Sequence, residues 1–123
     1  MILLKRVYDP DGIDAESRFL VDRLWPRGIK KETLRCDAWI KDVAPSNELR
    51  AWYQHDPDKW DEFRKRYFSE LEAKPESWQP ILAAAQKGTV ALLYSSRETR
   101  LNNAVALKEY LEKKMARRPR RPL

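Results

Sequence analysis

The central stretch of the second half of the chain reads Thr89-Val90-Ala91-Leu92-Leu93-Tyr94-Ser95, a continuous apolar run that directly follows Gly88. An apolar run without polar alternation is typical of a strand that is buried on both faces, as in a parallel sheet. A second such run, Phe19-Leu20-Val21, lies within residues 18–25 and stops at the turn Pro26-Arg27-Gly28. The two runs predict two strands of one small sheet.

Helical patterns fill most of the sequence between and after these strands. The clearest helix follows Asp56-Pro57, with apolar residues three and four positions apart, namely Trp60, Phe63, Tyr67 and Leu71. We also expect helices after the N-cap Ser46, over about residues 77–86, and after a cap at Asn102-Asn103. A further short strand is expected over residues 5–8. The order strand, strand, helices, strand, helix predicts an α/β fold with a small, at least partly parallel sheet flanked by helices.

Length and composition favour a single domain that lies in a reducing cytoplasm. The chain has 123 residues, and no apolar run approaches the roughly 18–20 residues that a membrane span needs. One cysteine, Cys36, and one histidine, His55, form neither an intrachain disulfide nor a Cys/His zinc site. The sequence also contains no Walker loop, GxGxxG or GxSxG motif. We therefore expect no metal and no cofactor.

The net charge of +6 lies in the C-terminal segment rather than in the body of the protein. Removing the six basic residues of that segment from the total of 25 leaves 19, which equals the number of acidic residues. The six are Lys113, Lys114, Arg117, Arg118, Arg120 and Arg121. We expect one domain over residues 1–112 and a disordered basic tail over 113–123, because two prolines interrupt any helix there. Three roles stay open for the tail: a solvated segment, a salt-sensitive contact with nucleic acid, and a contact with an anionic membrane surface.

Two loops are the predicted place for a binding site, because ligands of parallel sheets bind outside the carboxyl ends of the strands. These loops are residues 22–28 and residues 94–97, followed by the helix start at Asn102-Asn103. If the two strands are neighbours, the loops bring together Asp22, Arg23, Arg27, Tyr94, Ser95 and Asn103. Arginines beside hydroxyl groups and a helix N-terminus suit a phosphate, sulfate or carboxylate.

Each of these residues also has a purely structural interpretation. Asp22 and Arg23 could form an internal ion pair that ends a strand, Tyr94 could hydrogen-bond at a strand end, and Asn102 could serve only as a helix cap. His55 lies at a helix break, where a capping or surface role competes with that of a general base. Cys36 is expected to be an unreactive, half-buried thiol.

The string Val21-Asp22-Arg23-Leu24-Trp25-Pro26-Arg27-Gly28 resembles the DUF488 family, and more narrowly its short YeaO-like branch. Residues 5–10, 39–46, 48–50 and 92–95 carry the same likeness, which extends over about residues 3–112. The family name denotes a domain of unknown function, so the resemblance implies a fold class rather than an activity. The matching motif positions are Arg6, Tyr8, Asp22, Arg23, Trp25, Pro26, Arg27, Gly28, Lys41, Pro45, Ser46, Leu49, Arg50, Tyr94 and Asn102. His55 also matches a histidine that is often found in relatives.

Two departures from the family pattern argue against particular chemistries. The family commonly has Asn-His-Ala where this chain has Asn102-Asn103-Ala104, so a histidine acid or base is missing there. The longer branch resembles a rhodanese-like layout, and the resemblance implies a distantly rhodanese-like layout for this chain as well. That branch has a cysteine after its later strand, but residues 93–96 contain none. Thiolate catalysis is therefore not expected.

We favour an enzyme or binding domain for a small anionic or phosphorylated ligand. Arg23 and Arg27 would clamp the anion, Asp22 would orient an arginine or act as a base, and Tyr94 and Ser95 would supply hydroxyl groups. The full set of ligand-binding candidates is Arg23, Trp25, Arg27, Lys41, Ser46, Arg50, Tyr94, Ser95, Asn102 and Asn103, with Asp22, Tyr94 and His55 as catalytic candidates. The alternatives are a module that binds nucleic acid through its tail, and an interaction protein that forms a homodimer through an apolar helix face.

Overall fold

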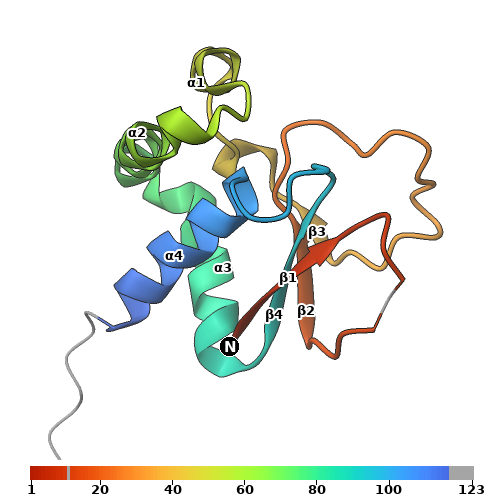
Figure 1. The fold of residues 1–123 in the computed structure, drawn as a ribbon. Coiled ribbons are helices and arrows are strands. Elements are labelled where there is room, and N and C mark those ends of the chain that lie inside the picture. Colours follow the sequence, from red (N-terminus) through yellow and green to blue (C-terminus); the bar gives the residue numbers. More distant parts are fainter. Residues whose placement is uncertain (11, 117–123) are drawn as a thin grey trace, which may run out of the picture.

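The computed structural model describes residues 1–10 and 12–116. Its four strands form one sheet in the order β1-β4-β2-β3, and every neighbouring pair is parallel (Figure 1). The strands are β1 (Ile2–Arg6), β2 (Ser17–Leu20), β3 (Ala38–Trp39) and β4 (Val90–Tyr94). The predicted α/β class with a small parallel sheet is confirmed.

β4 is the centre of the sheet, with β1 on one side and β2 on the other. Leu92 of β4 is paired with Leu4 of β1 and with Phe19 of β2. All five residues of β4 are buried, as the unbroken apolar run predicts. Because the strands are parallel neighbours, the carboxyl ends of β1, β4 and β2 lie at the same edge of the sheet.

Two strand boundaries differ from the predicted ones. The first strand spans Ile2–Arg6 rather than residues 5–8, because the chain turns after Arg6, where the amide of Asp9 bonds the Arg6 carbonyl at 3.1 Å. The second strand ends at Leu20 rather than near residue 25. The ladder stops soon after Leu20 because Val21 makes one more backbone bond to Leu93 and the chain then leaves the sheet.

The helices and turns begin near the predicted capping residues. The helices are α1 (Asn47–Tyr53), α2 (Trp60–Ala73), α3 (Pro75–Lys87) and α4 (Asn103–Ala116), with 3-10 turns η1 (Lys41–Val43) and η2 (Pro57–Lys59). Ser46 caps α1 through its hydroxyl, and Asp56 caps η2 through its carboxylate. Helix α4 continues to Ala116, four residues beyond the expected domain end at residue 112. Residues 113–116 are therefore helical and do not belong to a disordered tail, whereas residues 117–123 lie outside the described part of the chain.

The two faces of the sheet are covered differently. Helices pack on one face, where Phe63, Ile81 and Leu107 contribute fully buried side chains to the larger core. On the other face the described residues that pack against Leu20 and Leu93 come from loops and from the short β3, and no helix contributes to this smaller core. Figure 1 shows this contrast, with α3 and α4 on one side of the strands and long loops on the other. The helices that flank the sheet thus lie on one of its faces.

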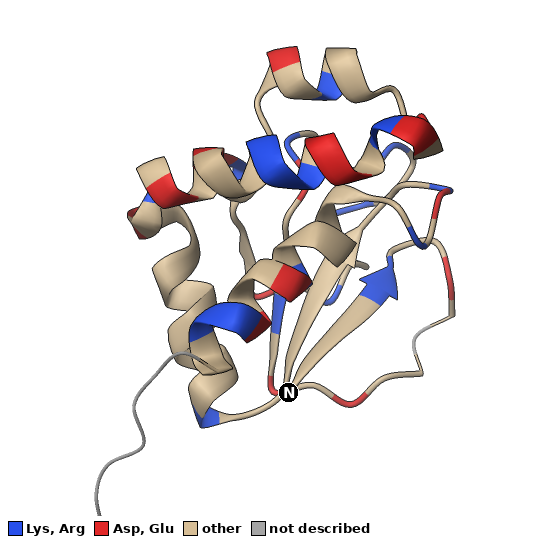
Figure 2. Cartoon of the chain, turned by 60° about the vertical axis from the view of Figure 1, so that its left-hand side comes forward, with Lys and Arg blue, Asp and Glu red and all other residues tan. Residues whose placement is uncertain are grey.

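The charged residues of the helices are mixed in sign. Figure 2 shows acidic and basic positions interspersed along α2 and α4. Within residues 1–10 and 12–116, no helix has the length and apolar character needed to cross a membrane. The buried apolar faces of the described helices pack into the larger core.

Candidate functional site

A pocket of about 680 Å³ lies at the carboxyl edge of the sheet, where the loop rule predicts a site. The loops after β1, β2 and β4 line it together with α1 and the start of α4. The lining residues are Arg6, Tyr8, Asp22, Arg23, Leu24, Trp25, Pro26, Arg27, Ala44, Pro45, Arg50, Tyr53, His55, Phe63, Ser95, Ser96, Arg97 and Asn103. This volume falls in the range of small-molecule binding sites.

The carboxylate of Asp22 organises the floor of the pocket. One oxygen, Oδ2, accepts hydrogen bonds from the amide and the hydroxyl of Ser95, each at 2.8 Å. The other, Oδ1, accepts one from Nδ2 of Asn103 at 3.2 Å. Asp22 thereby ties the end of β2 to the end of β4 and to the first turn of α4. Both of its oxygens are occupied, so the geometry supports a positioning role rather than that of a base.

Arg23 is held by backbone carbonyl groups and not by Asp22. Its Nε and Nη2 donate to the carbonyl oxygens of Ala44 and Pro45 at distances of 3.2–3.4 Å. Within the described part of the chain, the Asp22–Arg23 ion pair that the sequence left open is not formed. Arg23 therefore fixes the loop that precedes α1, and its Nε and Nη2 groups already donate to backbone carbonyl oxygens.

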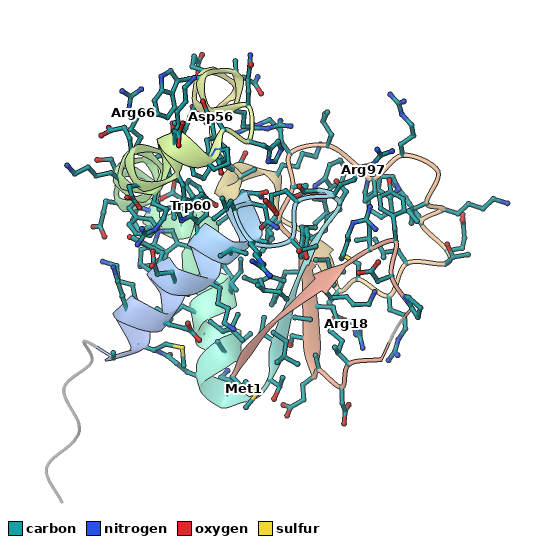
Figure 3. The ribbon with its side chains drawn as sticks, viewed as in Figure 1. Met1, Arg18, Asp56, Trp60, Arg66 and Arg97 are labelled. Atoms are coloured by element: carbon teal, nitrogen blue, oxygen red, sulfur yellow. The ribbon has the colours of Figure 1, made fainter. Side chains whose placement is uncertain are left out.

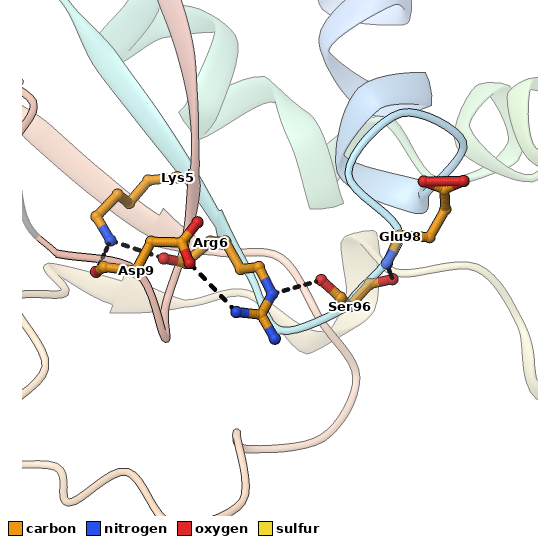
Figure 4. Close-up of polar contacts among 5 residues, drawn as sticks. All are labelled: Lys5, Arg6, Asp9, Ser96 and Glu98. Carbon is orange, nitrogen blue, oxygen red and sulfur yellow. Dashed lines mark hydrogen bonds and ion pairs between the residues drawn. The ribbon is translucent and has the colours of Figure 1, made fainter.

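Arg6 joins the end of β1 to the loop after β4 (Figure 4). Its Nε donates to the carbonyl of Ser96 at 2.9 Å, and its Nη1 contacts Asp9 Oδ1 at 3.3 Å. Beside it, the ammonium group of Lys5 donates to the carbonyl groups of Arg6 and Asp9 and so holds the turn after β1. These bonds fix one wall of the pocket.

Three other arginines of the pocket are exposed, and their guanidinium groups have no hydrogen-bond or ion-pair partner among the described residues. They are Arg27 from the loop after β2, Arg50 from α1, and Arg97 from the loop after β4. Figure 3 shows Arg97 in the loop beyond the end of β4. With Arg6 and Arg23 there are five guanidinium groups in the lining, against the single carboxylate of Asp22. The pocket is strongly electropositive and has free donors for an anion.

An aromatic wall closes the pocket on the side of the helices. The rings of Tyr53 and Phe63 stack with their centroids 4.1 Å apart, and Phe63 is only 2% exposed. The hydroxyl of Tyr53 donates to the carbonyl of Leu101 at 2.7 Å. Burial, with smaller contributions from Glu98 and Asp56, raises the pKa of Tyr53 to about 12. Tyr53 is therefore protonated at neutral pH and acts as a fixed donor and not as a base.

His55 lies at the rim, directly after α1. Gln54 and His55 have φ angles of 46° and 55°, in the left-handed region that residues other than glycine rarely adopt. The His55 ring is exposed, and its centroid lies 5.7 Å from that of Tyr53. Within the described lining it is the one imidazole. The predicted helix break is confirmed, and the position at the pocket keeps His55 as a candidate.

Two predicted site residues after β4 do not line the pocket. The side chain of Tyr94 is buried and hydrogen-bonds that of Asn102, and burial is the main cause that raises the pKa of Tyr94. Asn102 is completely buried, donates to the carbonyl of Glu98 and accepts from the amide of Val105. These contacts match the structural interpretations that the sequence left open, a hydrogen-bonded strand end and a helix cap.

Two predicted site residues of the middle loop are also directed elsewhere. Lys41 places its ammonium group 4.4 Å from the centroid of the Trp39 ring, outside the pocket lining. Ser46 accepts from the amide of Leu49 and donates to a carboxylate oxygen of Glu70 at 2.6 Å. Ser46 is therefore a helix cap that connects α1 to α2.

The remaining predicted residues do reach the pocket, and several lining residues were not predicted. Arg23, Trp25, Arg27, Arg50, Ser95 and Asn103 are in the lining, as are the catalytic candidates Asp22 and His55. The lining residues absent from the prediction include Arg6, Tyr8, Arg97, Tyr53 and Phe63. Arg6 ends β1, so the same strand-end rule could have found it, and Arg97 lies in the predicted loop 94–97 without having been named as a candidate. Tyr53 and Phe63 carry no such signal, because they fit the apolar helix faces equally well.

Of the six basic residues predicted to form the tail, the structure describes Lys113 and Lys114. Lys114 forms an ion pair with Glu72 at 2.6 Å, and the Lys113 ammonium lies 5.5 Å from the centroid of Phe68. The predicted tail residues Arg117, Arg118, Arg120 and Arg121 lie outside the described residues. The contact with nucleic acid stays a prediction.

The cysteine of the chain, Cys36, lies outside the lining of the pocket. Cys36 is half-buried as expected, its Sγ lies 3.1 Å from the carbonyl oxygen of Ala38, and burial raises the pKa of its thiol. A raised pKa disfavours the thiolate that nucleophilic chemistry requires. Over residues 1–10 and 12–116, no group of three His, Cys, Asp or Glu side chains is arranged to hold a metal ion.

Comparisons with known proteins find a family model and several relatives that match this chain. A family model described as "Inactive DUF488-N3 subclade" matches residues 1–122. The chain is 41% identical to the uncharacterized protein YeaO of Escherichia coli over 110 residues, which cover 89% of this chain and 96% of that protein. It is also 51% identical over 70 residues to the uncharacterized protein Rv3073c of Mycobacterium tuberculosis, a match that covers 57% of this chain and 59% of that protein. No solved structure matches the chain.

Proposed function

Because this chain belongs to the DUF488 family, in its inactive DUF488-N3 subclade, we propose that it binds a small anionic or phosphorylated ligand without transforming it. The observation that carries the proposal is the set of three free arginines, Arg27, Arg50 and Arg97, in one pocket. They come from three different segments, so an anion held between them would connect parts of the fold that are far apart in sequence.

Electrostatics supports an anionic ligand in particular. Five guanidinium groups share the pocket with one carboxylate, and that carboxylate, on Asp22, already accepts three hydrogen bonds. Guanidinium groups match the oxygens of phosphate and carboxylate through paired N–H donors. A bound anion would also reduce the repulsion between neighbouring positive charges.

The lining residues support binding rather than catalysis. The Ser95 hydroxyl donates to Asp22, and the Tyr53 hydroxyl donates to a carbonyl and has its pKa raised to about 12. Asn103 uses its amide to hold Asp22 and the carbonyl of Val21. His55 is the remaining acid–base candidate in the described lining, and it has no oriented partner there. The subclade description as inactive agrees with this reading.

The test is a calorimetric titration of the full chain with inorganic phosphate, sulfate and pyrophosphate at low and high salt. Arg97→Gln and Arg27→Gln should each weaken binding by about tenfold or more, because each removes a charged hydrogen-bond donor. The matched control is Arg100→Gln, since Arg100 is exposed in the same loop as Arg97 but does not line the pocket. Equal losses in all three variants, or no binding at high salt, would reduce the effect to general charge and contradict the proposal.

A further inference from the structure

We infer that the ligand of this pocket is a nucleotide, meaning a phosphate ester that carries a planar base. This inference rests on the proposed function, because it needs the same arginines for the phosphate. What it adds is a role for apolar and aromatic surface at the mouth of the pocket that a simple anion would leave unused.

The mouth of the pocket carries unusual apolar exposure. In the described chain three large hydrophobic side chains are exposed, and apart from the terminal Met1 they are Tyr8 and Leu24. Tyr8 is 42% exposed and Leu24 is 67% exposed, and both line the pocket. A single exposed hydrophobic residue needs no explanation, but two on one pocket rim suit an apolar part of a ligand.

The aromatic side chains at this rim are fixed in place, as a stacking surface requires. The hydroxyl of Tyr8 donates to the carbonyl of Arg27 at 2.6 Å, and the guanidinium of Arg6 lies 4.9 Å from the centroid of its ring. The indole nitrogen of Trp25 donates to the carbonyl of Ile29 at 2.6 Å. The Trp25 ring also meets that of Trp39 edge to face, with centroids 5.5 Å apart. Rings held in this way bind a planar base at a low cost in conformational entropy.

Two of the free arginines, Arg50 and Arg97, come from other segments than the apolar rim residues, whereas Arg27 lies in the same loop as Leu24 and Trp25. Tyr8, Leu24 and Trp25 come from the loops after β1 and β2, and Trp25 packs on the loop-covered face of the sheet. Arg50 comes from α1, whose residues pack with the helix-covered face. Figure 1 shows α1 and these loops on opposite sides of the end of β4. A ligand that places its base against the loops after β1 and β2 and its phosphate toward Arg50 and Arg97 fits this arrangement.

The size of the pocket also favours a nucleotide over a small inorganic anion. Inorganic phosphate would fill only a small part of a cavity of about 680 Å³, whereas a nucleotide is of the size for which cavities of several hundred Å³ are typical. Nucleotide recognition in proteins commonly combines arginine contacts to phosphate with stacking of the base on aromatic rings. Both components are present here in one cavity.

The experiment compares AMP with ribose 5-phosphate and adenosine by calorimetry on the full chain. The two phosphate esters have the same phosphate group, so their difference measures the contribution of the base. We expect AMP to bind at least about tenfold more tightly than ribose 5-phosphate, as stacking of one base allows. Tyr8→Ala should remove much of that advantage, whereas Tyr8→Phe, which keeps the ring, should retain it.

The outcomes separate this inference from the proposed function. Equal affinities for AMP and ribose 5-phosphate would overturn the nucleotide inference and leave anion binding intact. Adenosine binding as tightly as AMP would instead overturn anion binding as the basis of the site, and no binding of any phosphate ester would overturn both. A 5′-phosphorylated trinucleotide then distinguishes a free nucleotide from the end of a nucleic-acid chain, according to which of the two binds more tightly.

Discussion

At the scale of single residues, the Asp22 carboxylate holds the floor of the pocket together through its hydrogen bonds. Its three hydrogen bonds connect β2, β4 and α4, and no other carboxylate lies in the described lining. In Asp22→Asn one side-chain oxygen is replaced by a donor group, which would face either the donors of Ser95 or that of Asn103. We expect the free energy of unfolding, measured in urea, to fall by about 1–3 kcal/mol. Asp58→Asn, at an exposed position, is the control and should change it little.

Tyr53 makes stability depend on pH in the alkaline range. Its pKa is raised from 10 to about 12, chiefly by burial, so the unfolded chain loses the hydroxyl proton before the folded protein does. The stabilisation is fully present below pH 10 and is lost as pH rises through about 12. We expect the free energy of unfolding to decrease between these pH values, and Tyr53→Phe to show a shallower decrease. An unchanged slope in Tyr53→Phe would assign the effect to Tyr67 or Tyr94, whose pKa values burial also raises.

At the scale of elements, the end of α1 is strained in a way that positions His55. Gln54 is the C-cap of this helix at φ 46° and ψ 35°, a conformation that costs residues with a Cβ roughly 1 kcal/mol or more. Gln54→Gly should relieve this cost and raise the free energy of unfolding by up to about 1 kcal/mol. Chemical denaturation measures it, and Gln79→Gly, at an exposed position inside α3, is the control that should destabilise. A loss of stability in Gln54→Gly would mean that the left-handed turn is not strained.

At the scale of the whole molecule, the charge of the C-terminal segment leads to a separate prediction. The hypothesis of nucleic-acid binding requires affinity for DNA that falls steeply with salt and disappears when Arg117, Arg118, Arg120 and Arg121 are all replaced by serine. The replacement is made in the full chain, because α4 extends to Ala116 and a cut at residue 112 would remove part of the helix. Electrophoretic mobility shifts measure the affinity. DNA binding that survives the replacement would exclude the tail as the contact, and sedimentation of the same proteins tests the homodimer hypothesis.

The sequence by itself determined the features that depend on neighbours along the chain. The apolar run at residues 90–94 predicts a buried central strand, and the hydroxyl of Ser46 predicts the start of α1. Asp56, expected to cap the long helix, caps η2 directly before α2. The general rule for parallel sheets then pointed to the loop after β2, which supplies six residues of the pocket lining. Each of these inferences uses partners within a few residues, or a rule that holds for every sheet of this kind.

Only the tertiary structure decided which polar side chains already have hydrogen-bond partners in the protein and which do not. Arg23 and Arg27 look alike in the sequence, yet Arg23 is held by carbonyl groups 21 and 22 residues away and Arg27 has an open guanidinium among the described residues. Tyr94 was expected in the pocket and is buried beside it, while Arg97, three residues later, lines it. The physical reason is that hydrogen-bond partners are set by the packing of segments distant in sequence, and a pattern of residue types along the chain does not contain that packing.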